Sequence, residues 1–204
     1  MSETLRTARV PALEEVPGLV HGFEQRVAAA ARDELSLADE PGKRDDARRR
    51  VASALERFGR LLLLKQVHGA EVRRAVAAAH AGWRGTAAGV ARAAVGALLA
   101  GGSRPEDLVA ATGPCIGPCC YEVGDELRAA FGEKGAEFFR PGPRGRPHLD
   151  VRAANERQLR EAGIAESRIH RVADCTRCRA DLYHSYRRDG KGAGRMINFV
   201  GFAG

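Results

Sequence analysis

Apolar residues follow two patterns along the chain. Short continuous or alternating runs predict buried strands, whereas apolar residues that recur every three or four positions predict amphipathic helices. Strands are predicted within Val16–Phe23, Leu61–Leu64, Val76–Ala79, Asp107–Thr112, Arg168–Asp174 and Arg195–Val200. Helices are predicted over residues 47–58, 86–100, 123–131 and 151–162. This mixture of patterns favours a fold that combines α and β elements.

Several of the predicted helices have recognisable ends. Asp46 and Asp150 stand at N-termini, where a carboxylate can accept hydrogen bonds from free backbone N–H groups. Gly59, Gly101 and Gly163 stand at C-termini, where glycine commonly ends a helix. The sequence contains no internal repeat and no stretch typical of a linker. A single domain over residues 1–204 is therefore predicted.

Composition and charge indicate which kinds of molecule the protein is expected to bind. The 204 residues are enough for one domain with a buried core, and 44% of them are hydrophobic. The formal net charge is +7, but the basic residues are spread along the chain and no motif interleaves them with aromatic residues. Nucleic acid is therefore not expected as a partner. A basic surface does attract phosphate and other small anions.

The sequence also indicates the cellular compartment of the protein. No run of about eighteen apolar residues is present, so no membrane span is expected. The N-terminal residues carry acids and lack the apolar core of a signal peptide. Five cysteines, an odd number without regular spacing, do not fit a secreted disulfide framework. A cytoplasmic protein with reduced thiols is predicted.

Two histidines stand at the ends of predicted strands and beside small residues. His68 and His80 both occupy places where the backbone can turn and a ligand can approach. Arg84, in the motif Gly-Trp-Arg-Gly, precedes a predicted helix whose free N–H groups would favour an anion. A lone histidine at a strand is more often structural, which is our interpretation of His21. The combination of two histidines with Arg84 predicts a functional site.

The cysteines leave several interpretations open. Cys115 lies in a turn rich in Gly and Pro, where a nearby helix N-terminus would make it reactive; a small buried side chain is the alternative. Cys119 and Cys120 are adjacent, which fits no common zinc spacing. Cys175 and Cys178 have the C-x-x-C spacing of a zinc or redox pair, but no second C-x-x-C accompanies them. A structural role is favoured for this pair.

Five motifs stand in the order found in one known family. They are KQVHGAEV, HAGWRGTAAGV, GPCIGPCCYEVGDE, SYRRDG and GRMINFV. From about His21 to Val200 the chain resembles the laccase-domain or multicopper polyphenol oxidoreductases, better described as zinc-dependent purine nucleoside phosphorylases with adenosine deaminase activity. The resemblance implies an α+β fold, a layered sandwich of mixed β-sheets covered by helices in a single domain.

The resemblance also implies a cofactor, substrates and site residues. Zinc is the implied cofactor, and purine nucleosides and phosphate are the implied small-molecule partners. His68 and His80 match the family's two histidine ligands, but the Ala-Asp-Cys-x-Pro strand that carries its third ligand is missing, since only eleven residues separate these histidines. Cys115 or water is the candidate replacement. Arg84 is the first candidate for binding phosphate and Arg187 the second.

Three functions from different classes remain open. The first is a zinc-dependent purine nucleoside phosphorylase that also deaminates adenosine. The second is a family member that binds a nucleoside or a protein partner without turnover, which the shortened segment between His68 and His80 favours. The third is a thiol enzyme with Cys115 as nucleophile and one of the two histidines as base. Copper fits less well than zinc, because several copper centres would need many more histidines.

Overall fold

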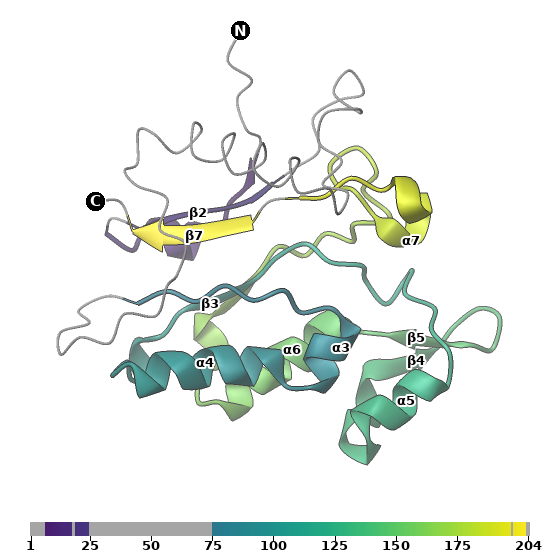
Figure 1. Ribbon diagram of the computed structural model, residues 1–204, viewed down its shortest axis with the longest axis horizontal. Coiled ribbons are helices and arrows are strands. Elements are labelled where there is room, and N and C mark those ends of the chain that lie inside the picture. The colour runs from purple at the N-terminus through teal and green to yellow at the C-terminus, as the bar shows by residue number, and fades with distance from the viewer. Residues whose placement is uncertain (1–6, 18, 25–74, 197, 203–204) are drawn as a thin grey trace, which may run out of the picture. The chain divides into compact units, whose positions relative to one another are not determined.

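The computed structural model describes residues 7–17, 19–24, 75–196 and 198–202 (Figure 1). The chain divides into two compact units, one formed by Met1–Val67 with Arg179–Gly204 and the other by His68–Cys178. The helix predicted over residues 47–58 and the strand predicted at Leu61–Leu64 lie outside the described residues, as does His68. The prediction of one domain over residues 1–204 stays a prediction.

The first unit contains an antiparallel sheet. Its strands, in the order β1-β2-β7, are β1 (Thr7–Ala8), β2 (Leu19–Glu24) and β7 (Asn198–Phe202). Pairing of β2 with β7 runs from Leu19 opposite Phe202 to Phe23 opposite Asn198. The strands predicted within Val16–Phe23 and Arg195–Val200 are therefore confirmed, with their ends shifted. The described helices of this unit are short: α1 (Pro11–Glu14), α7 (Tyr186–Asp189) and η6 (Gly190–Gly192).

His21 lies in the middle of β2 and is only 2% exposed. The backbone N–H of Val10 donates to its Nε2 over 2.9 Å, and Nη1 of Arg9 donates to its carbonyl oxygen over 2.6 Å. Burial, and then the charge of Arg9, lower the pKa of His21, while Glu14 acts in the opposite direction. A buried, neutral imidazole that accepts a backbone hydrogen bond agrees with the structural role inferred for this residue.

The second unit is built on a parallel pair of strands, β3 (Ala110–Thr112) and β6 (Ile169–Arg171). Two helices of eleven residues, α4 (Val90–Ala100) and α6 (Val151–Glu161), pack beside each other, and α6 contacts β3 (Figure 1). The apolar core between these elements contains the buried side chains of Val95, Ile164 and Ile169. The 3₁₀ turns η3 (Pro105–Asp107) and η5 (Glu166–Arg168) lead into the two strands. Both strands lie inside the predicted runs, which confirms those predictions.

A second core of the same unit lies around a hairpin. The hairpin pairs β4 (Phe139–Pro141) with β5 (Pro147–Leu149), and α5 (Glu126–Phe131) and η4 (Glu133–Phe138) precede it. Buried side chains from these elements, from α6 and from the segment before α5 form the core: Val123, Leu127, Phe138, Phe139, Leu149, Val151 and Ala154. α6 therefore contributes to the core of the hairpin as well as packing against β3.

The helix predictions hold best where a cap is present. Asp150 caps α6 by accepting from the backbone N–H of Ala153 over 3.0 Å. The helix predicted over residues 86–100 is instead split into α3 (Trp83–Ala87) and α4, because Gly89 adopts a positive φ of 82° between them. The helix predicted over 123–131 begins later, at Glu126.

One predicted strand is wrong. Residues 75–82 have no regular secondary structure, although a strand was expected at Val76–Ala79. No described strand pairs with this segment, and Ala78 and Ala79 are exposed. Three consecutive alanines also lack the branched side chains that favour strands. The fold class is nevertheless confirmed, since parallel and antiparallel pairs combine with helices in an α+β structure.

Candidate functional site

The predicted site begins in the irregular segment that ends at α3. His80 is exposed, and its Nε2 lies 3.1 Å from where a Cβ on Gly82 would stand, so a side chain at Gly82 would press on the imidazole. Trp83 packs against the core of the hairpin. The guanidinium of Arg84 lies over the indole of Trp83, 4.4 Å from the ring centroid. The indole thus holds the exposed cation of Arg84 by a cation–π contact.

Thr86 fixes this segment from inside the unit. It is 1% exposed, and its hydroxyl lies within 3.2 Å of the carbonyl of Ala81 and 3.0 Å of that of Gly82. On α6, the amide of Asn155 donates to the Thr86 hydroxyl over 2.9 Å, and that of Gln158 donates to the Thr86 carbonyl over 2.6 Å. Buried hydrogen bonds of this kind anchor the backbone next to His80 and leave its side chain exposed.

Arg84 was predicted to precede a helix, but it is the second residue of a short helix, α3. α3 has five residues, and Gly89 separates it from α4. The peptide dipoles of one turn add up to little, so the full positive charge of this segment is that of the guanidinium and not of the helix terminus. The predicted orientation of Arg84 toward both histidines stays a prediction, because His68 lies outside the described residues.

Cys115 has the properties of a packed thiol. Its half-buried side chain contacts the core of the hairpin. Burial raises the pKa of the Cys115 thiol, although the charge of Arg152 acts in the opposite direction. A thiol that stays protonated at neutral pH is a poor nucleophile, so this environment favours the small buried cysteine over the thiol enzyme.

The other four cysteines converge, which the sequence did not predict. The Sγ atoms of Cys119, Cys120, Cys175 and Cys178 all lie within 4.8 Å of one another. That of Cys178 lies 3.7 Å from the sulfur of Cys119 and 3.4 Å from that of Cys120. All five cysteines of the chain are described, and none forms a disulfide. Cys119 and Cys120, whose adjacent positions fit no common zinc spacing, thus form one cluster with Cys175 and Cys178.

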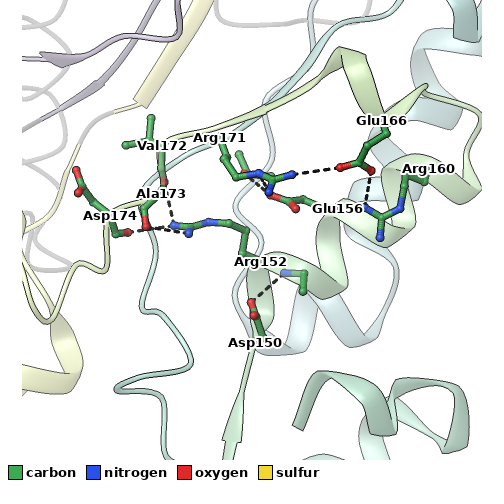
Figure 2. Close-up of polar contacts among 11 residues, drawn as sticks. Asp150, Arg152, Glu156, Arg160, Glu166, Arg171, Val172, Ala173 and Asp174 are labelled. Atoms are coloured by element: carbon green, nitrogen blue, oxygen red, sulfur yellow. Dashed lines mark hydrogen bonds and ion pairs between the residues drawn. The ribbon is translucent and has the colours of Figure 1, made fainter. Parts of the chain in front are cut away.

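An arginine orders the chain that leads to the C-x-x-C pair. Arg152, in the first turn of α6, donates to the carbonyls of Val172, Ala173 and Asp174 over 2.9, 3.0 and 3.0 Å (Figure 2). These three residues come directly before Cys175. One guanidinium therefore fixes the path of the backbone from β6 to the cysteines.

A buried carboxylate ties α6 to the strand ends. Glu156 is 6% exposed; it accepts from the hydroxyl of Thr112 over 3.2 Å and pairs with Nε of Arg171 over 3.1 Å. Arg171 also reaches Glu166, which pairs in turn with Arg160 (Figure 2). The buried carboxylate is thus both ion-paired and hydrogen-bonded, which offsets the cost of its desolvation.

The remaining predicted residues are not brought together by the described structure. Arg187 is exposed in α7 of the first unit, so its predicted role in binding phosphate stays a prediction. Among the described residues, the four cysteines form the only group of three or more potential metal ligands. His80 therefore belongs to no described group of three or more potential ligands, and zinc at His68 and His80 stays a prediction.

Residues 70–203 match the model of a known family, the multi-copper polyphenol oxidoreductase laccases. The chain belongs to this family. The match includes His80, Arg84 and all five cysteines, and it begins after His68.

Relatives of the chain carry the names of purine enzymes. It is 40% identical over 131 residues to purine nucleoside phosphorylase YlmD of Geobacillus stearothermophilus, covering 62% of this chain and 48% of the relative. It is also 40% identical over 131 residues to adenosine deaminase RL5 of an unknown prokaryotic organism, covering 61% and 49%. The crystal structure of YlmD from G. stearothermophilus matches with a TM-score of 0.57 and 37% identity over 62% of this chain and 48% of that one. The chain spans about half the length of the curated relatives it matches. No described helix has the length and apolar character needed to cross a membrane.

Proposed function

We propose that the protein is a purine nucleoside phosphorylase that also deaminates adenosine, with zinc bound by His68 and His80 as its cofactor. The observation that carries the proposal is the identity of 40% with relatives named for both activities, over an alignment of 131 residues. Its substrates are adenosine, inosine and phosphate, and it acts in the cytoplasm.

The geometry around Arg84 supports a phosphate-binding role. Phosphorolysis requires a phosphate oxygen aimed at C1′ of the ribose while the purine leaves. A guanidinium presents donors in a planar fork that matches two phosphate oxygens. In this chain the fork is exposed, stacked on Trp83, and attached to a helix whose backbone Thr86 anchors. Arg84 is thus a cation held in place at the surface, as a positioning group for phosphate must be.

Zinc would supply the chemistry of the second reaction. A zinc ion held by neutral imidazoles lowers the pKa of a bound water toward about 7, which provides a nucleophile for deamination of adenine. His80 is exposed beside small residues, so its ring is accessible to an ion. Cys115 is the candidate third ligand, with water as the alternative.

A binding protein without turnover is the second candidate. It is favoured by the missing Ala-Asp-Cys-x-Pro segment, since two histidines alone make a weak zinc site.

Product analysis separates the two candidates. The reduced protein, with zinc added, is incubated with inosine or adenosine in the presence or absence of phosphate, and the products are separated by chromatography. The proposal predicts hypoxanthine and ribose 1-phosphate from inosine only when phosphate is present, and inosine from adenosine without it. A protein that binds a nucleoside in calorimetry and forms none of these products is the non-catalytic family member instead.

A further inference from the structure

Two cysteine-bearing loops leave the same edge of a sheet. β3 and β6 are parallel, with Ala110 opposite Ile169, so their carboxyl ends lie side by side. The pairing continues beyond the strands, because the N–H of Thr176 donates to the carbonyl of Cys115 over 3.0 Å. The loop after β3 contains Cys119 and Cys120, and the loop after β6 contains Cys175 and Cys178. Residues separated by more than fifty positions thus meet because of strand order.

The spacing of the sulfurs suits a single ion. Four thiolates at about 2.3 Å from a tetrahedral zinc are about 3.8 Å from one another. Here the described sulfur–sulfur distances from Cys178 are 3.4 and 3.7 Å, and all four sulfurs lie within 4.8 Å of each other. These separations are well beyond a disulfide bond of about 2.05 Å.

The surroundings favour negative charge on the sulfurs. The backbone N–H groups of Gly117, Cys178 and Arg177 donate hydrogen bonds to the sulfur of Cys175. Gly117 makes its contact over 3.2 Å. Donors directed at one sulfur favour its thiolate form, and the thiolate is the form of cysteine that binds a metal.

The cluster is also rigidly framed. Gly117 is buried, and a Cβ there would stand 3.3 Å from the sulfur of Cys119 and 3.4 Å from Cβ of Cys175, so the loops pack closely. Arg152 fixes the chain before Cys175, and Nη1 of Arg177 lies 3.6 Å from the sulfur of Cys120. Both loops are therefore held in place before any ion binds, and a cation stands near the thiolates.

We propose that Cys119, Cys120, Cys175 and Cys178 bind one zinc ion in a closed four-thiolate site that joins the loops after β3 and β6. Four protein ligands leave no open position for water or substrate, so the site is structural. Sulfur ligands in a tetrahedral arrangement select zinc or iron among common metals, and a mononuclear site without redox chemistry suits zinc. The proposal is independent of the proposed function, because it uses none of the residues assigned to substrate or to the catalytic ion.

Metal counting tests the site apart from the histidines. The full chain carrying His68→Ala and His80→Ala is purified under reducing conditions with zinc chloride, dialysed and examined by elemental analysis. The proposal predicts one zinc per chain. Adding Cys178→Ser should remove that zinc, whereas adding Cys115→Ser, which changes the one cysteine outside the cluster, should retain it. Replacing zinc with cobalt chloride should give the visible bands of a tetrahedral thiolate complex, absent after Cys178→Ser.

A second measurement guards against misfolding of the variants. Zinc is stripped from the same double-histidine protein by a chelator and then added back, without any cysteine being changed. Loss and recovery of the ion should lower and restore the melting temperature in step. Zinc-free reduced protein, iron in place of zinc, or a Cys120–Cys178 disulfide in peptide mapping would each overturn the proposal. Absence of phosphorolysis, in contrast, bears on the proposed function alone.

Discussion

The segment from His80 to Arg84 and the four-cysteine cluster, both in the second unit, present functional groups in opposite ways. In the first, the buried contacts are made by Thr86 and by the backbone, while the imidazole and the guanidinium stay exposed. In the second, the functional side chains themselves converge, and their sulfurs lie within 4.8 Å of one another. Exposed side chains on a fixed backbone, such as those of His80 and Arg84, are suited to a substrate that binds and leaves. Converging groups suit a permanently bound ion.

Arg152 provides the strongest test of how the cysteine cluster is held. Arg152→Ala removes three hydrogen bonds from a cation to the carbonyls before Cys175. We expect a loss of about 3 kcal/mol in the free energy of unfolding, since hydrogen bonds to charged groups are worth about 1.5–3 kcal/mol each and water replaces part of them. Urea unfolding measures it. The matched control is Arg168→Ala, which removes an exposed arginine, and an equal loss in both variants would contradict the framing role of Arg152.

The two regions also differ in how far the sequence predicted them. His80 and Arg84 were identified because they stand a few residues apart in a recognisable motif. The cysteine cluster was missed because Cys120 and Cys175 are far apart in sequence and only the parallel pairing of β3 with β6 brings them together. The spacing of residues in the sequence predicts contacts between residues that are close along the chain. It does not predict which strands are neighbours in a sheet, and the cysteine cluster depends on that order.

The same distinction explains the fold predictions. α6 was predicted accurately because its Asp150 cap and Gly163 stop are local signals. The strand at Val76–Ala79 was wrong because an apolar run forms a strand only when a neighbour pairs with it, and no described strand does so. The break at Gly89 was missed because glycine is tolerated inside helices, and only its φ of 82° separates α3 from α4.

Thr86 provides the corresponding test for the His80–Arg84 segment. Thr86→Val keeps the shape of the side chain and removes the hydroxyl that contacts Ala81, Gly82 and Asn155. Leaving buried partners unpaired should lower the free energy of unfolding by about 2 kcal/mol. Ser167→Ala, which deletes an exposed hydroxyl, should change it by less than about 0.5 kcal/mol. If both variants unfold at the same urea concentration, Thr86 does not anchor the segment.

Gly117 tests how tightly the cysteine loops are packed. Gly117→Ala places a methyl group 3.3 Å from the sulfur of Cys119 and 3.4 Å from Cβ of Cys175, so these neighbours must move by a few tenths of an ångström. Overpacking of this kind should cost about 1–2 kcal/mol of stability. In contrast, Gly96→Ala in α4 meets no atom within 4 Å and should stabilise by up to about 1 kcal/mol. Thermal unfolding should show a lower melting temperature for Gly117→Ala and a higher one for Gly96→Ala. A higher melting temperature for both variants would show that the loops accommodate a methyl group at Gly117.

In the first unit, the stability contributed by the buried residue His21 should depend on pH. The pKa of His21 is lowered in the folded protein, so unfolding takes up a proton when the pH falls below the ordinary histidine value of 6.5. The contribution of His21 to stability is therefore full above that pH and is lost as the pH falls further. His21→Gln should make the dependence of the urea midpoint on pH shallower between roughly pH 8 and 5. An unchanged slope would show that His21 is not the titrating group.

The central claim is that the exposed side chains of the His80–Arg84 segment bind the substrate, while the cysteine cluster does not. The Michaelis constant for phosphate in inosine phosphorolysis measures this most directly, compared between the unmodified protein, Arg84→Ala and the exposed-arginine control Arg92→Ala. Because Arg84→Ala removes the guanidinium that we propose binds phosphate, it should raise that constant roughly 10- to 100-fold, with little change in Arg92→Ala. An unchanged constant in Arg84→Ala would contradict the claim.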